Sequence, residues 1–213
     1  MEARNNADYV IVIVHGGHEF YQLPSPRMQK LYRHFIDLGA DAVINHHQHC
    51  YSGYEEYKGK HIIYGLGNLC FDWGCNSGQK WVEGYMITLN IKPDTTTISL
   101  HPYIQCQEKA SILIMDQESS DNFHEKIENL NEIINNDLKL HEAYSQYVNN
   151  HRSRIIRLFS SYHNRYLNAA VKRGLLPQLT NRKELLSIMN YITCEAHRDV
   201  TINVLNDFLH HKL

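Results

Sequence analysis

The sequence predicts an α/β protein of the sandwich type, in which a βαβ unit and antiparallel strands precede a helical C-terminal region. Three observations predict this class. Two short apolar runs flank an amphipathic segment, two later β-branched runs flank a Pro-Asp turn, and the last part of the chain has helical periodicity with few glycines. We therefore expect residues 1–117 to form the α/β part and residues 118–213 to form a helical extension.

The first βαβ unit is predicted by periodicity and by the residues that begin and end its helix. Residues 9–14 are a continuous apolar run, which is typical of a strand buried on both faces. Ser25 and Pro26 supply an N-cap and a proline at the first helical position, and Gly39 suits the end of the helix. Apolar residues lie between them at helical spacing: Met28, Leu31, Tyr32, Phe35, Ile36 and Leu38. Residues 42–44 then form a second strand, parallel to the first.

Further strands and helices follow along the chain. Residues 61–64 form a short strand, and residues 85–91 and 97–103 form a hairpin around the Pro93-Asp94 turn. Residues 111–115 are a further short strand. The helical region begins with a single apolar helix face, which consists of Ile127, Leu130, Ile133 and Ile134, and continues with apolar clusters in residues 155–159 and 185–209.

Charge and hydropathy exclude some classes of protein. The formal net charge is −2 at pH 7, so no basic field indicates a nucleic-acid partner. No segment reaches the roughly 18 apolar residues of a membrane span. The first residues are not a signal peptide, so the chain alone indicates a cytoplasmic location. A core-type strand begins only about eight residues into the chain. We therefore expect the chain to begin partway through a larger domain, and a truncated N-terminus would also allow the extracytoplasmic envelope.

The cysteines predict free thiols in a reducing compartment. There are five of them, an odd number without regular spacing: Cys50, Cys70, Cys75, Cys106 and Cys194. A bridge between Cys70 and Cys75, or a thiolate metal ligand, is the alternative interpretation.

Histidines gather where the two apolar runs of the βαβ unit end. His15 follows the first run, and His47 and His49 follow the second. The ends of neighbouring parallel strands lie at one edge of a sheet, where α/β proteins bind ligands. Neutral imidazole is a common ligand of borderline metals. We therefore predict that these three residues bind a divalent metal ion; the alternative is a hydrogen-bonded polar loop without metal.

Further polar side chains lie beside these ligands in the sequence. His46 and His18 could act as a general acid or could orient a ligand. Glu19 could supply a carboxylate, although a capping or solvated residue is an equally good interpretation. Asn68 follows a break after a strand and could contact an anion, although a turn residue is the commoner role. The sequence contains neither a Walker loop nor a nucleophile elbow nor a dinucleotide fingerprint.

Four segments together resemble the CapA family of capsule synthesis proteins, the poly-γ-glutamate group related to calcineurin-like metallophosphoesterases. They are residues 12–20, 24–26, 38–49 and 62–68, and the resemblance covers about residues 7–105. It implies a partial metallophosphatase-like sandwich with a two-metal site on loops after strands. By this resemblance His15 matches the histidine of the family's His-Trp-Gly-x-Glu motif and Glu19 its glutamate. His47 and His49 match the His-x-His pair, and Asn68 matches the asparagine of Ser-Leu-Gly-Asn.

The chain also departs from the family pattern. Gly16 replaces the tryptophan, Asn45 replaces a glycine and Gln48 replaces a proline. The segments that supply the bridging carboxylate and the other ligands in the family have no counterpart here. A bridging carboxylate normally offsets the repulsion between two cations about 3.5–4 Å apart. We therefore expect this chain to bind at most one metal ion, with Mn, Fe and Zn as the candidates.

The resemblance implies a metal-dependent hydrolase, or its C-terminal part, that acts in capsule, poly-γ-glutamate or cell-envelope polymer metabolism. Activity is expected if the missing N-terminal half is supplied. The alternative is a catalytically inactive scaffold or binding subunit that has half of the two-metal site. The expected substrate is an anionic polymer or a phosphoester. An open sheet edge predicts either a homodimer or a partner that supplies the N-terminal half.

Overall fold

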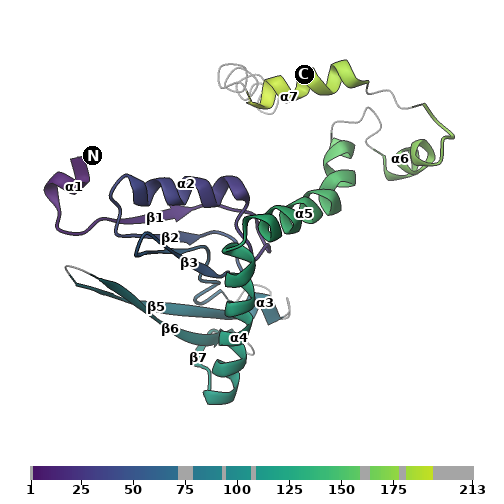
Figure 1. The fold of residues 1–213 in the computed structure, drawn as a ribbon. Helices are drawn as coiled ribbons and strands as arrows, with labels where there is room; N and C mark the ends of the chain where they lie inside the picture. Colours follow the sequence, from purple (N-terminus) through teal and green to yellow (C-terminus); the bar gives the residue numbers. More distant parts are fainter. Residues whose placement is uncertain are drawn as a thin grey trace, which may run out of the picture. The chain divides into compact units, whose positions relative to one another are not determined.

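The computed structural model describes residues 2–71, 79–92, 95–106, 109–158, 164–177 and 181–193. It confirms the α/β class, with two sheets and several helices (Figure 1). The chain divides into two compact units, residues 1–146 and 147–213. The expected division at residue 117 coincides with the start of a helix, whereas the first unit continues to residue 146.

The elements of the first unit begin with α1 (Glu2–Asn6), β1 (Ile11–His15), α2 (Pro26–Asp37), β2 (Ala42–His46), β3 (Tyr54–Tyr57) and β4 (Lys60–Ile63). They continue with α3 (Gln79–Val82), β5 (Glu83–Ile91), β6 (Thr96–Gln105), β7 (Ile112–Ile114) and α4 (Gln117–Ile134). Helix α5 (Asp137–Leu158) spans the division between the units, and α6 (Arg165–Lys172) and α7 (Arg182–Thr193) belong to the second unit. No helix in the described ranges is long and apolar enough to cross a membrane.

The βαβ unit forms as the sequence predicts. The four-stranded sheet has the order β1-β2-β4-β3, with β1, β2 and β4 parallel and β3 antiparallel to β4. Helix α2 connects β1 to β2. Its N-cap is Ser25, whose Oγ accepts a hydrogen bond from the Met28 N–H, and Pro26 occupies the first turn. Gly39 ends the helix with a φ of 100°, a conformation that favours glycine. Strand β3 was not predicted from the sequence.

Apolar clusters lie on both faces of this sheet. Helix α2 covers one face, where Tyr32 and Ile36 pack against Val43 and Ile62. The second sheet, of order β5-β6-β7 and antiparallel throughout, lies beneath the other face (Figure 1). There the side chains of the two sheets meet those of α4: Ile63, Tyr85, Phe123 and Ile127. Because α4 completes this core, the first unit extends past residue 117.

The prediction that the first strand is buried on both faces is wrong. Strand β1 is an edge strand, and the side chains of Ile11 and Ile13 are 42% and 72% exposed. On the opposite face, Val12 and Val14 are partly buried against the α2 side of the core. The apolar cluster that joins the two sheets includes Ile44 and Ile63 from β2 and β4, but no residue of β1. One face of β1 is therefore left exposed to solvent.

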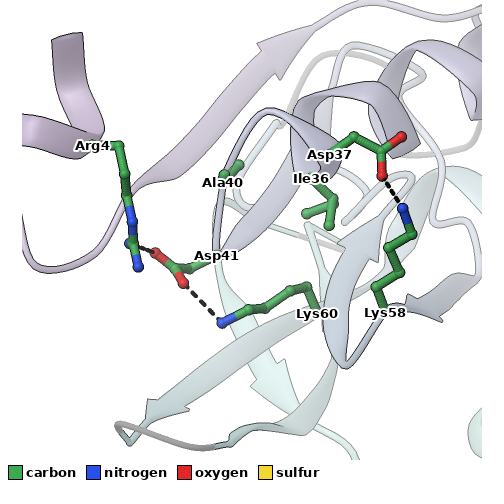
Figure 2. A pocket seen from close by; sticks show the side chains of 8 residues that line it. Arg4, Ile36, Asp37, Ala40, Asp41, Lys58 and Lys60 are labelled. Atoms are coloured by element: carbon green, nitrogen blue, oxygen red, sulfur yellow. Dashed lines mark hydrogen bonds and ion pairs between the residues drawn. The ribbon is translucent and has the colours of Figure 1, made fainter. Parts of the chain in front are cut away.

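Asp41 links several segments at the end of the first sheet opposite to the histidines. The carboxylate of Asp41 is buried, and its Oδ2 accepts hydrogen bonds from Arg4 Nη1 at 2.8 Å and from the Val10 N–H at 2.9 Å. Its Oδ1 accepts from Lys60 Nζ at 2.8 Å. Figure 2 shows these three side chains around one pocket. Asp41 thus connects α1, the entry to β1 and strand β4.

The remaining predictions vary in outcome. Cys50, Cys70 and Cys106 form no disulfide, as expected of thiols. The bridge between Cys70 and Cys75, the Pro93-Asp94 turn and the apolar residues from 200 to 209 lie outside the described residues, as does Cys194.

In the second unit, Asn164 caps α6, where its Oδ1 accepts from the Tyr166 N–H at 2.8 Å.

Candidate metal centre

The histidines lie at the ends of β1 and β2 or in the loops that follow, and backbone hydrogen bonds hold these two segments together. Strands β1 and β2 end side by side, with His15 paired in register to His46. The Gly16 N–H donates to the His46 carbonyl at 3.0 Å, and the Phe20 N–H donates to the Gln48 carbonyl at 2.7 Å. The two clusters that follow the apolar runs therefore lie side by side at the carboxyl ends of parallel strands.

His15 and His47 form the closest pair of imidazoles in this site. His15 Nε2 lies 3.1 Å from His47 Nδ1, and the two rings meet edge to face with centroids 4.8 Å apart. Two nitrogens that bind one zinc ion at about 2.0–2.1 Å lie about 2.9–3.4 Å from each other, depending on the coordination geometry. The N–N distance of the pair is therefore compatible with one metal ion. In the absence of an ion, the same distance suits an imidazole–imidazole hydrogen bond.

The backbone is strained where it presents two of the histidines. His47 has a φ of 110° and His49 a φ of 56°, both in the left-handed region that non-glycine residues rarely adopt. Such conformations persist only where the surrounding structure holds them, and they are found most often at functional sites. They turn both side chains out of strand geometry after β2, which is the condition for their convergence.

Asn68 fixes the orientation and the tautomer of His49. Asn68 is buried, and its Nδ2 donates to the carbonyls of His49 at 3.1 Å and Trp81 at 3.2 Å. Its Oδ1 must therefore face His49 Nδ1, which lies 2.8 Å away. Because that oxygen only accepts, neutral His49 carries its proton on Nδ1, and its Nε2 keeps a lone pair. A metal-binding histidine is commonly held in this way through its second nitrogen.

A buried network of hydrogen bonds supports the loop that carries His47 and His49. Asn45 is fully buried and accepts a hydrogen bond from the Tyr32 hydroxyl at 2.7 Å. Its Nδ2 donates to Gln48 Oε1, to the Gly16 carbonyl and to the Tyr64 carbonyl. Gln48 is also buried, and its Nε2 donates to the Tyr64 carbonyl. In the sequence, Asn45 and Gln48 are only departures from the family pattern. In the structure, their buried side chains hydrogen-bond to the backbone around the loop that carries His47 and His49.

Aromatic side chains form a wall beside His49 that sequence reasoning missed. Trp81 stacks on His49 with ring centroids 5.4 Å apart, and Phe20 stacks on Trp81 at 5.7 Å. Phe71 meets His49 at 5.5 Å. Phe20 is 58% exposed, so the wall has an open side. Phe20 and Phe71 lie in separate loops and Trp81 lies on α3, and no local sequence pattern connects them.

The other predicted residues, His46, His18 and Glu19, have different surroundings. His46 is the register neighbour of His15, and desolvation together with the charge of His15 lowers the pKa of its imidazole. His18 packs instead on Tyr144, with ring centroids 5.8 Å apart. Glu19 is exposed and makes no hydrogen bond or ion pair within the described ranges.

The set of donors at the site consists of imidazoles. Among the residues that the structure describes, no three or more His, Cys, Asp and Glu side chains gather into a group that could hold a metal ion. The ring centroids of His47 and His49 are 6.2 Å apart, so His49 does not join the close pair in this conformation. The nitrogens of His15 and His47 lie at a distance compatible with one ion, and Asn68 fixes the orientation of His49.

Comparison with known proteins finds a partial similarity to capsule synthesis proteins. The family of the bacterial capsule synthesis protein PGA_cap matches residues 1–73. The capsule biosynthesis protein CapA of Bacillus anthracis is 42% identical over 71 residues, which are 33% of this chain and 17% of that protein. The PGA biosynthesis protein CapA of Bacillus subtilis is 30% identical over 138 residues, which are 60% of this chain and 36% of that protein. The similarity thus spans well under half the length of either relative.

Proposed function

We propose that this chain acts as a CapA-like capsule synthesis protein, and that its histidines serve a metal-dependent hydrolase acting on capsule or cell-envelope polymers. In this proposal His15, His47 and His49 hold a divalent metal ion, with Mn, Fe and Zn as the candidates. The observation that carries the proposal is the 3.1 Å separation of His15 Nε2 and His47 Nδ1, beside a His49 whose tautomer leaves Nε2 as an acceptor.

A divalent ion at this position would polarise a phosphoryl or acyl oxygen and lower the pKa of bound water. The chain's own residues supply the remaining chemistry. The lowered pKa of His46 keeps its imidazole neutral near pH 7, so it is better suited to accept a proton than to donate one. Because His18 packs on Tyr144, it is a weaker candidate for proton transfer. Glu19 is exposed, and in this proposal it supplies a carboxylate to the site only when bound substrate draws it towards the histidines.

Asn68 takes a different role from the expected contact with an anion. Both ends of its amide are engaged by His49 and by the Trp81 carbonyl. We therefore propose that Asn68 is a positioning residue for His49 and not a substrate contact. The substrate class that the relatives' names indicate is a capsule polymer, and poly-γ-glutamate or a phosphoester would bring anionic oxygens to the ion.

The proposal is tested with the full chain, supplied in turn with Mn²⁺, Fe²⁺ or Zn²⁺. The substrates are bis(p-nitrophenyl) phosphate and poly-γ-glutamate, and His15→Ala is compared with the wild type. We expect turnover that requires the metal and falls at least about tenfold in His15→Ala, because one of the close pair is lost. The matched control is His141→Ala, an exposed histidine on α5 that should keep full activity. Equal turnover in His15→Ala and wild type would refute the assignment.

A second function is favoured by the donor set. The described residues bring no carboxylate to the imidazoles, so nothing there offsets the charge of a second cation. We therefore also propose a scaffold or binding subunit that recognises the polymer without cleaving it. Calorimetry with poly-γ-glutamate distinguishes the two functions: binding without turnover for every metal supports the scaffold, and metal-dependent turnover supports the hydrolase.

A further inference from the structure

Two thiols from separate elements lie next to each other beside the site. Cys70 belongs to the loop that follows Asn68, and Cys106 directly follows β6. Their Sγ atoms are 3.7 Å apart, although 36 positions separate them in the chain. We propose that Cys70 and Cys106 are an oxidisable pair that forms a disulfide between the loop after β4 and the end of β6.

The approach of the two thiols is held by contacts other than their own. On one side of Cys70, the Asn68 carbonyl accepts a hydrogen bond from the Tyr103 hydroxyl at 3.0 Å. On the other side, the Phe71 N–H donates to Gln105 Oε1 at 2.7 Å. Both partners lie on β6, close to Cys106. The segment that carries Cys70 is therefore attached along β6 at two points, which keeps the thiols together.

The position of Cys106 is fixed as well. Its side chain is buried, and its N–H donates to the Ser111 carbonyl at 2.8 Å. Its φ of 46° is in the left-handed region, so the surrounding structure must hold this backbone conformation. A disulfide requires about 2.0 Å between the sulfurs, so rotation of the exposed Cys70 side chain has to close a gap of about 1.7 Å.

The difference in exposure between the two thiols sets the order of the reaction. Cys70 is exposed and Cys106 is buried, so a peroxide meets Cys70 first. The Cys70 thiol is oxidised to a sulfenic acid while the peroxide is reduced to water. The Cys106 sulfur then attacks the Cys70 sulfur, the S–S bond forms, and the hydroxyl leaves as a second water. In total, two thiols and one hydrogen peroxide give one disulfide and two waters.

The bond would join two parts of the sandwich. It would link the loop after β4, in the first sheet, to β6 in the second sheet and close a loop of about 37 residues. The chain-entropy model of such a loop predicts a rise in Tm on the order of 10 °C. It would also fasten the segment that carries Asn68. The proposal concerns the bond alone, so it does not depend on whether the histidines bind a metal.

The test is peptide mapping of the full chain by mass spectrometry, without reduction, after treatment with hydrogen peroxide. We expect a linked pair of peptides containing Cys70 and Cys106, lost on reduction with dithiothreitol, and a higher Tm in the oxidised protein. Cys70→Ser changes an exposed residue and should abolish both results, whereas the control Cys75→Ser should keep both. A bridge from Cys70 to Cys75, a bridge between chains, or thiols at Cys70 and Cys106 that remain open to alkylation would overturn the proposal.

Discussion

Asn68 and His49 hold each other through two hydrogen bonds that run in opposite directions. Asn68 Oδ1 lies 2.8 Å from His49 Nδ1, and Asn68 Nδ2 donates to the His49 carbonyl at 3.1 Å. One amide therefore fixes both the backbone and the ring of this histidine. A short polar side chain, buried after a strand break, is what keeps the imidazole lone pair available to a ligand.

Replacing Asn68 should weaken metal binding without removing any ligand. In Asn68→Ala, His49 loses its acceptor, and the buried carbonyl of Trp81 loses one of its two donors but keeps Gln105 Nε2. We expect metal affinity to fall about 10–100-fold, as for other residues that orient a ligand. Stability should fall by about 1–3 kcal/mol. Zinc titration and urea unfolding measure the two effects. Asn90→Ala, at an exposed position on β5, is the control; equal losses there would contradict the role of Asn68.

Asp41 should make the protein less stable in acid. Burial opposes ionisation of its carboxyl, but hydrogen bonds from Lys60 and the Val10 N–H, with the charges of Lys60 and Arg4, lower its pKa. A lowered folded-state pKa gives stability that is present above the unfolded pKa of about 3.9 and is lost as the pH falls through the folded pKa.

The corresponding variant is Asp41→Asn. At neutral pH we expect it to lower the free energy of unfolding by about 2–3 kcal/mol, because Arg4 and Lys60 lose a charged acceptor. Urea unfolding at a series of pH values should show the difference from wild type shrinking below about pH 4. Glu142→Gln, an exposed carboxyl on α5, should show no such pH dependence. If the difference in unfolding free energy between Asp41→Asn and wild type stays constant down to pH 2, ionised Asp41 does not stabilise the fold.

The exposed face of β1 should cause self-association. Strand β1 has an unpaired edge, and Ile13 on it is 72% exposed. Two such edges can pair, which places the Ile13 side chains of the two copies on one continuous face, where they partly cover each other. We expect sedimentation velocity to show a dimer of the full chain and a shift to monomer in Ile13→Lys. Leu138→Lys, at another exposed apolar position, is the control and should remain dimeric. A wild-type chain that is monomeric at high micromolar concentration would refute the pairing.

The sequence predicted those parts of the fold that depend on local signals. Helix α2 is capped by Ser25 and followed by Gly39 as expected, because a cap, a proline and a glycine act on their own backbone. Burial of β1 could not be predicted, since it depends on how far the second sheet extends beneath the first.

The same difference applies to the site. The histidines follow strands, so their shared edge of the sheet could be predicted from strand order alone. The positioning of His49 could not, because it depends on Asn68 and on the carbonyl of Trp81, which lie about 19 and 32 positions farther along the chain. The wall formed by Phe20, Phe71 and Trp81 is likewise a product of tertiary packing.

The central claim is that His15 and His47 form the core of a site for one metal ion. The most direct measurement is calorimetric titration of the full chain with Zn²⁺, repeated with His47→Ala and with the control His141→Ala. The account predicts one equivalent bound, an affinity at least about tenfold lower in His47→Ala, and no change in His141→Ala. No binding by the wild type, two equivalents bound tightly, or the same affinity in His47→Ala as in wild type would contradict it.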